Sequence, residues 1–297
     1  MSSPRLLDLA RERPVLFDGA IGTELMVRGL APGSCPEPWN VDRPEIVRAI
    51  HRSYFDAGAD AVSTNSFGGN PIKLAPHGLQ ARCRELNIAA AKAAVEVRPP
   101  GKYVLGSIGP TGKFLRPQGE YTESDFETAF GIQAVALAEG GVDVILIETM
   151  YDLREALCAV RAAQSSCSLP VFVTITFNKT RRGFFTLMGD SPAKCAGAFD
   201  ALGLAAYGTN CTLTGADMAD VVVEFRKHSA KLLIAQPNAG QPEIQGTGSV
   251  VYSQGIADFA ASVPKLVAAG ANFVGGCCGT NPEYIRRAAA VLRARSF

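Results

Sequence analysis

The segment "SDFETAFGIQAVALAEGGVDVILIE" (residues 124–148) joins an amphipathic, alanine-rich stretch to a short apolar run rich in β-branched residues. The stretch over 124–141 predicts a helix, and "DVILIE" (143–148) predicts a buried strand. Two glycines separate them, and glycine at a helix end takes the left-handed conformation that stops the helix. The segment therefore has the pattern of a helix followed directly by a strand.

The same pattern recurs along the whole chain. Eight strands are predicted, at "PVLFDG" (14–19), "DAVSTN" (60–65), "KYVLGS" (102–107), "DVILIE" (143–148), "PVFVTITF" (170–177), "LAAYGTN" (204–210), "KLLIAQP" (231–237) and "NFVGG" (272–276). Helical patterns lie between them, and those at 44–58 and 255–270 also end in Gly before a strand. Eight such units predict an α/β fold with one domain over residues 1–297, a closed (β/α)₈ TIM barrel. The alternative is an open, doubly wound sheet.

Composition favours a small-molecule partner. Twenty-nine basic and 28 acidic residues give a net charge of +1, which offers no electrostatic case for nucleic acid or a membrane surface. No apolar run approaches the ~18 residues of a membrane span. The charged N-terminal stretch does not resemble a signal peptide. Eight irregularly spaced cysteines in 297 residues favour a reducing, cytoplasmic location.

Polar residues follow the predicted strands. If the sheet closes into a barrel, these residues share one rim, where catalytic groups are expected. They are Asp18 and Gly19, Thr64 and Asn65, Gly106 and Ser107, Glu148, Asn210 and Cys211, Asn238, and Cys277 and Cys278. Three thiols are therefore expected to converge, although 66 positions separate Cys211 from Cys277.

Three sulfurs with space for a fourth ligand describe an open zinc site, because Zn²⁺ takes four tetrahedral N or S ligands and a catalytic site leaves one position for substrate. Glycines flank Cys277 and Cys278 and allow a tight turn. The alternative is that the pair is a vicinal disulfide or two small buried hydrophobic residues. Cys83, Cys158, Cys167 and Cys195 are interpreted as packing or surface residues, and so is Cys35, whose loop crosses the rim.

Two acidic residues stand on the same rim as the thiols. Asp18 and Glu148 are predicted to hold a substrate ammonium group, since two carboxylates neutralise a bound amino acid without proton transfer. A salt bridge or a helix cap is the alternative interpretation of Glu148.

Seven motifs, in order, resemble the homocysteine S-methyltransferase family. They are "LFDGAIGTEL" (16–25), "TNSFGGN" (64–70), "GSIGPTG" (106–112), "IETM" (147–150), "TNC" (209–211), "PNAG" (237–240) and "GGCCGT" (275–280). The resemblance covers nearly the whole chain. It implies a (β/α)₈ barrel with Zn²⁺ held by Cys211, Cys277 and Cys278, and transfer of a methyl group to the thiol of L-homocysteine, giving L-methionine.

The resemblance also implies a substrate site. It places the amino and carboxylate groups of homocysteine near Asp18, Gly19, Thr64 and Glu148, and Asn238 beside the metal. Asn65 is expected to complete the substrate site. Zinc removes the thiol proton, so a bound thiol is nucleophilic at neutral pH and no general base is needed.

The sequence leaves the methyl donor open between a small onium compound, of the S-methylmethionine or betaine type, and a separate methyl-corrinoid protein. Trp39 could face a quaternary ammonium group. However, the two tyrosines that mammalian-type betaine enzymes use near the donor correspond to Gly68 and Thr149 here. Two other functions remain as alternatives: a lyase or aldolase with Lys179 as Schiff base, and a non-catalytic zinc- or thiol-sensing barrel.

Overall fold

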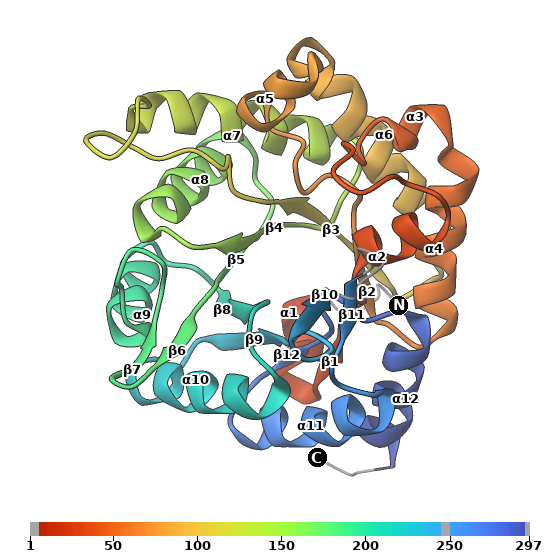
Figure 1. The fold of residues 1–297 in the computed structure, drawn as a ribbon, viewed down its shortest axis with the longest axis vertical. Helices are drawn as coiled ribbons and strands as arrows, with labels where there is room; N and C mark the ends of the chain where they lie inside the picture. Colours follow the sequence, from red (N-terminus) through yellow and green to blue (C-terminus); the bar gives the residue numbers. More distant parts are fainter. Residues whose placement is uncertain (1–5, 245–249, 295–297) are drawn as a thin grey trace.

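Eight parallel strands form a barrel, as predicted, and not an open doubly wound sheet (Figure 1). The computed structural model describes residues 6–244 and 250–294. The barrel strands are β1 (Val15–Leu16), β2 (Ala61–Ser63), β3 (Tyr103–Ile108), β4 (Val144–Met150), β5 (Val171–Ile175), β8 (Ala206–Asn210), β9 (Leu232–Gln236) and β12 (Phe273–Val274). Their order is β1-β12-β9-β8-β5-β4-β3-β2, and a parallel bridge between Phe17 and Ala61 closes the ring.

Helices follow the strands and surround the barrel (Figure 1). The outer helices are α4 (Pro44–Asp56), α6 (Cys83–Val95), α7 (Glu123–Glu139), α8 (Leu153–Ser166), α9 (Pro192–Ala201), α10 (Gly215–His228), α11 (Ile256–Ala268) and α12 (Pro282–Arg293). The predicted glycine stops are confirmed, because Gly58, Gly141 and Gly270 all have positive φ. Within the described residues, no helix combines the length and apolarity needed to cross a bilayer.

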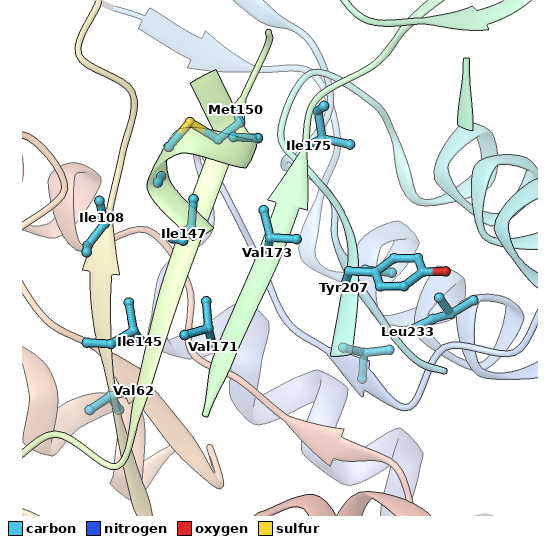
Figure 2. Close-up of a cluster of buried hydrophobic side chains, with 14 of the residues drawn as sticks. Val62, Ile108, Ile145, Ile147, Met150, Val171, Val173, Ile175, Tyr207 and Leu233 are labelled. Atoms are coloured by element: carbon cyan, nitrogen blue, oxygen red, sulfur yellow. The ribbon is translucent and has the colours of Figure 1, made fainter. Parts of the chain in front are cut away.

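The strand side chains alternate between two hydrophobic layers. Outward residues such as Ile145 and Ile147 pack under the helices (Figure 2). Inward residues such as Val144 and Leu146 fill the barrel. A short helix that was not predicted, α1 (Leu6–Glu12), packs Leu6 and Ala10 against this inner layer where the strands begin. The alternation matters for the site, because it decides which rim residues point inward.

Loops after the strands carry smaller elements that the apolar pattern did not predict. They are α2 (Ile21–Val27), α3 (Trp39–Asp42), α5 (Pro71–Leu74), two 3₁₀ turns (Ala75–His77 and Gln80–Arg82), and the hairpins β6–β7 (Asn178–Thr180 and Gly183–Phe185) and β10–β11 (Pro242–Ile244 and Val250–Tyr252). The basic segment 178–183 lies mostly in the exposed β6–β7 hairpin. All these elements enlarge the rim at the carboxyl ends of the strands.

Helix α4 contains a fully buried histidine. His51 is 0% exposed, and neither ring nitrogen has a hydrogen-bond partner in the described structure. Burial lowers the pKa of His51 from 6.5 to about 4. The folded protein therefore keeps this ring neutral, while the unfolded chain takes up a proton below pH 6.5.

The His51→Leu variant is expected to flatten the acid side of the stability profile. Because the pKa of His51 is depressed, the free energy of unfolding falls by about 3 kcal/mol between pH 6.5 and pH 4, and leucine removes that fall. Urea unfolding of both proteins between pH 7 and pH 4 measures it. The exposed His77, replaced in the same way, serves as the control. Equal loss of stability in the His51→Leu variant and the wild type would contradict the assignment.

Candidate active site

Three thiols meet at the rim of the barrel. Cys211 follows β8, and Cys277 and Cys278 follow β12. The Sγ atoms of Cys211 and Cys278 are 3.8 Å apart, and all three sulfurs lie within 4.8 Å of one another. Backbone bonds hold both loops to the end of β9, since Cys211 N donates to Gln236 O at 3.0 Å and Cys277 N donates to Pro237 O at 2.8 Å.

Tight turns present these thiols. Cys211 itself has a φ of 64° and so occupies the left-handed region, which a residue with a side chain rarely adopts. In the second loop Thr280 Oγ1 donates to Cys277 O at 2.7 Å and accepts from Ala20 N at 3.2 Å. A Cβ on Gly276 or Gly19 would lie 2.4 or 2.5 Å from that hydroxyl. Glycine at positions 19 and 276 therefore allows the loop after β12 to approach the loop after β1.

The three thiols change one another's pKa values. Hydrogen bonds from the thiols of Cys277 and Cys278 lower the pKa of Cys211. For Cys277 and for Cys278, the hydrogen bond to Cys211 is the largest cause of the raised pKa. Three thiols this close together could give up their protons to a shared cation, because metal binding to cysteine ligands releases protons.

A soft metal ion fits this donor set. Thiolates select metals such as Zn²⁺, and the three sulfurs leave room for another ligand. Asn238 lies beside them: its side chain contributes to the lowered pKa of Cys211, and its Oδ1 is buried with no hydrogen-bond partner in the described residues. An orphaned buried oxygen next to three thiols is a further potential ligand.

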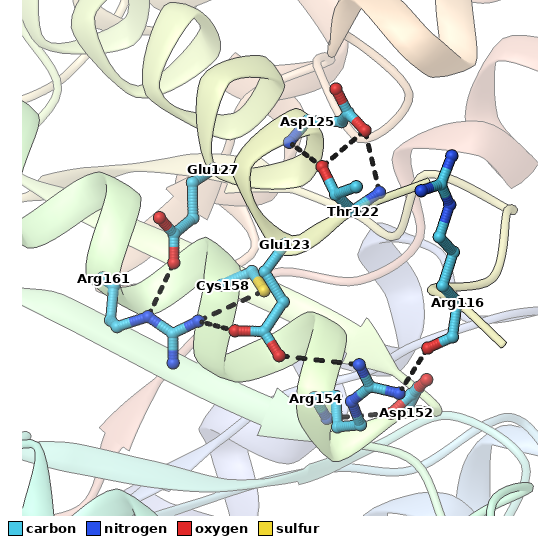
Figure 3. Close-up of polar contacts among 9 residues, drawn as sticks. All are labelled: Arg116, Thr122, Glu123, Asp125, Glu127, Asp152, Arg154, Cys158 and Arg161. Atoms are coloured by element: carbon cyan, nitrogen blue, oxygen red, sulfur yellow. Dashed lines mark hydrogen bonds and ion pairs between the residues drawn. The ribbon is translucent and has the colours of Figure 1, made fainter. Parts of the chain in front are cut away.

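A second cluster does not fit a metal. Glu123, Glu127 and Cys158 lie close together on the outer helices α7 and α8, but Arg161 already binds all three (Figure 3). Its guanidinium donates to the two carboxylates at 2.9 and 2.7 Å and to the sulfur at 3.4 Å. This cluster is an ion-pair network that joins two helices.

One cavity lies at the end of the barrel where the strands begin, away from the thiols. It has a volume of about 420 Å³ and is lined by Arg13, Asp60 and Lys102, which precede β1, β2 and β3. Both cations pair with Asp60 at 2.8 and 2.9 Å. Asp60 thus bridges Arg13 and Lys102 and braces the base of the barrel.

Glu148 points into the barrel by strand alternation. Val144 and Leu146 of β4 face inward, and Glu148 continues the same parity at the top of the strand. Ser107 Oγ donates to one carboxylate oxygen. Burial raises the pKa of Glu148 to about 7, against the lowering effect of Ser107, and the charge of Cys211 adds to the rise.

Asp18 is the second buried carboxylate, 1% exposed. Ser63 donates to it twice, from its backbone N at 2.8 Å and from Oγ at 3.2 Å. Burial raises its pKa well above the usual range, and the charge of Glu148 adds to the rise. Within the described residues neither acid has a lysine or arginine partner. A cationic group between them would therefore be strongly favoured.

A cavity of about 290 Å³ lies between the acids and the thiols. Its polar lining includes Asp18, Gly19, Ser63, Thr64, Asn65, Ser107, Glu148, Thr149, Cys211, Gln236, Cys277 and Cys278. Its apolar and aromatic lining includes Ile21, Met26, Phe67 and Tyr252. The size suits a small amino acid and a small second substrate.

Two predicted substrate residues also hold the rim together. Thr64 Oγ1 accepts from Ser107 N at 3.0 Å and bonds Ser66 Oγ at 2.6 Å. Asn65 lines the cavity, but its Nδ2 donates to Pro36 O at 3.0 Å and to Asn40 Oδ1 at 2.9 Å. Asn65 therefore anchors the long loop after β1.

The sequence interpretation missed three groups that shape the cavity. Ser63 and Gln236 lie on the inward parity of β2 and β9, so strand alternation could have identified them. Tyr252 had no such signal. It arrives on hairpin β10–β11, lines the cavity with Cys278, and opposes the rise in the pKa of that thiol.

Two residues considered for other roles lie outside the cavity. The ring of Trp39 is covered by the Arg43 guanidinium at 4.8 Å from its centroid, and it packs on the outer core. Lys179 lies exposed in β6, where its Nζ pairs with Asp217 at 2.6 Å. That pairing raises the pKa of Lys179, whereas a Schiff-base lysine needs a lowered pKa.

Known proteins resemble this chain over most of its length. Methionine synthase of Mycobacterium tuberculosis (strain ATCC 25618 / H37Rv) is 34% identical over 307 residues, covering 97% of this chain and 25% of that protein. Methionine synthase of Mycobacterium leprae (strain TN) is 33% identical with the same coverage. The chain thus spans about a quarter of the length of these relatives.

Solved structures share the fold. The homocysteine methyltransferase MmuM from Escherichia coli, in its metallated form, matches with a TM-score of 0.77 at 23% identity, covering 95% of this chain and 97% of that one. A methyltransferase from Methanosarcina mazei matches with a TM-score of 0.62 at 12% identity, covering 98% of both chains. At these identities the likeness establishes the barrel alone.

The family profile described as homocysteine S-methyltransferase matches residues 15–292. The match runs from β1 into the last helix, α12, and so includes the three thiols and both buried acids. This chain belongs to the homocysteine S-methyltransferase family.

Proposed function

We propose that this chain transfers a methyl group to the thiol of L-homocysteine, giving L-methionine, with Zn²⁺ held by Cys211, Cys277 and Cys278. One observation carries the proposal: three clustered thiols and two carboxylates, which lack a cationic partner within the described residues, face the same cavity of about 290 Å³. The family match supports it, and so do the names of a methionine synthase and a metallated homocysteine methyltransferase among the similar proteins.

Zinc is proposed because three cysteine ligands with an open position suit it best, and when bound it supplies the Lewis acidity that lowers the pKa of a thiol. Asp18 and Glu148 accept the substrate ammonium group, while Ser63 and Ser107 orient these two carboxylates.

The remaining rim residues have proposed roles in substrate binding. Gly19, Thr64 and Asn65 line the amino-acid end of the cavity, and Asn238 stands beside Cys211. The homocysteine sulfur attacks the methyl carbon and forms the new S–C bond. The bond between that carbon and the donor breaks, its electron pair leaves with the donor, and the thiol proton passes to solvent.

The cavity favours a small onium donor of the S-methylmethionine or betaine type. Phe67 and Tyr252 line it, and aromatic faces attract sulfonium and ammonium groups. A methyl-corrinoid partner protein is the second candidate. Two apolar side chains at the rim favour it, since Met26 is 49% exposed and Val27 is 77% exposed. The chain also covers only 25% of the length of the similar methionine synthase.

We further propose that residues 1–297 act as one homocysteine-binding domain in the cytoplasm. All eight cysteines are unpaired, which supports a reducing compartment.

The test is methionine formation by zinc-loaded protein from L-homocysteine with S-methylmethionine, betaine or methylcobalamin, measured by chromatography. We expect turnover with one onium donor. Turnover with methylcobalamin alone would select the corrinoid alternative. Absence of homocysteine binding by fully zinc-loaded protein would overturn the transferase and favour a sensing barrel.

A further inference from the structure

Asn210 joins the two halves of the cavity. It is the last residue of β8, directly before Cys211, and it is completely buried. Its Oδ1 accepts from Thr149 N and from Thr174 Oγ1, both at 2.9 Å. Its Nδ2 donates to Thr149 Oγ1 at 2.7 Å. Both the oxygen and the nitrogen of the Asn210 side-chain amide thus hydrogen-bond Thr149, the residue after Glu148.

The same Nδ2 lies near the reactive groups. It is 3.5 Å from Glu148 Oε2 and 3.8 Å from Cys277 Sγ. Asn210 therefore contacts one of the acids and one of the thiols through a single amide, and its backbone continues into a second thiol residue, Cys211.

The turn that Asn210 holds is strained. Thr149 has a φ of 60°, a conformation that is costly for a β-branched residue. The register between β4 and β5 is also irregular between Ile147 and Met150. Such a backbone persists only where its surroundings hold it. The two hydrogen bonds between Asn210 and Thr149, one donated by each residue, supply that restraint one residue from the Glu148 carboxylate.

We infer that Asn210 sets the span between the ammonium-binding carboxylate and the thiol cluster, and thereby selects L-homocysteine over L-cysteine. The inference rests on the proposed function. L-cysteine is one methylene shorter, so its sulfur and ammonium group cannot both reach their sites when that span is rigid. Asn210 is in this sense a positioning residue that determines specificity.

An amide suits this role better than other side chains of its size. Its oxygen accepts two hydrogen bonds while its nitrogen donates to a hydroxyl beside two potential anions. Aspartate would place a negative charge next to Glu148 and Cys277. Alanine would leave the Thr149 turn unsupported and a cavity in its place.

The experiment is calorimetric titration of zinc-loaded wild type, Asn210→Ala and Asn210→Asp with L-homocysteine and with L-cysteine, with the zinc content measured before and after. One methylene is worth about 10- to 200-fold in a rigid site, and wild type should show a preference in that range. We expect both variants to reduce this preference at least about tenfold, chiefly by weakening the binding of L-homocysteine.

Two further variants make the outcome decisive. Thr149→Gly gives the turn more backbone freedom and removes the Oγ1 contact with Asn210, so it should also lower the preference, with Asn210 intact and even if the Asn210 variants lose zinc. Thr176→Val removes the hydrogen bond from the Thr176 hydroxyl to the backbone oxygen of Asn210 and leaves both bonds between Asn210 and Thr149 in place, so it should leave the preference within about twofold of wild type. An unchanged preference in the Thr149→Gly protein and in zinc-retaining Asn210 variants would overturn the inference. Failure of wild type to bind L-homocysteine would instead refute the proposed function.

Discussion

Replacing Cys278 with alanine is expected to abolish zinc binding and methionine formation while the barrel stays folded. The variant removes one of three sulfurs that lie within 4.8 Å of one another, and two protein thiols hold zinc poorly. Activity should fall about a thousandfold or more, because the metal contributes several kcal/mol to activating a nucleophile. Metal analysis and the methionine assay measure the two losses.

The fold should survive because Cys278 lies on the rim, outside both hydrophobic layers. Circular dichroism and thermal unfolding of the metal-free proteins check this point. The matched control is Cys167→Ala, which replaces another half-buried cysteine, at the end of α8, and should keep zinc and activity. Wild-type activity in a metal-free Cys278→Ala protein would refute the zinc-dependent mechanism.

Replacing Glu148 with alanine is expected to weaken L-homocysteine binding with zinc retained. The half-buried Glu148 carboxylate has no cationic partner in the described residues, so a substrate ammonium group would be its counter-ion. Removing one partner of a buried charge pair costs about 2–5 kcal/mol, which corresponds to at least about 30-fold in Kd. Calorimetric titration of the zinc-loaded variant measures the change.

Two companion variants separate charge from shape. Glu148→Gln keeps the size of the side chain and an acceptor for Ser107. If the negative charge determines the affinity, this variant should bind L-homocysteine nearly as weakly as the Glu148→Ala protein. Glu155→Gln alters another buried acid, one that accepts from Thr111 through a single oxygen, and should leave the affinity within about twofold. Unchanged affinity in the Glu148→Ala protein would remove the ammonium-binding role.

The sequence alone was enough to predict the barrel. Each βα unit is local: alternation of apolar side chains marks a strand, helical periodicity marks the next helix, and glycines such as Gly141 end the helices with positive φ. Strand ends share one rim in any such barrel, so Cys211 and Cys277 could be expected to approach each other across 66 positions. The motifs of the rim also identified the family that the profile match establishes.

Only the tertiary structure decided how the rim groups pair with one another. Asn210 binds Thr149 across 61 positions, Tyr252 reaches Cys278 from a hairpin with no predicted pattern, and Trp39 lies under Arg43 instead of facing the cavity. Local periodicity reports which face of an element is buried. It does not report which side chain of a distant element it meets, because that depends on the closure of the whole barrel and on the loops packed over its rim.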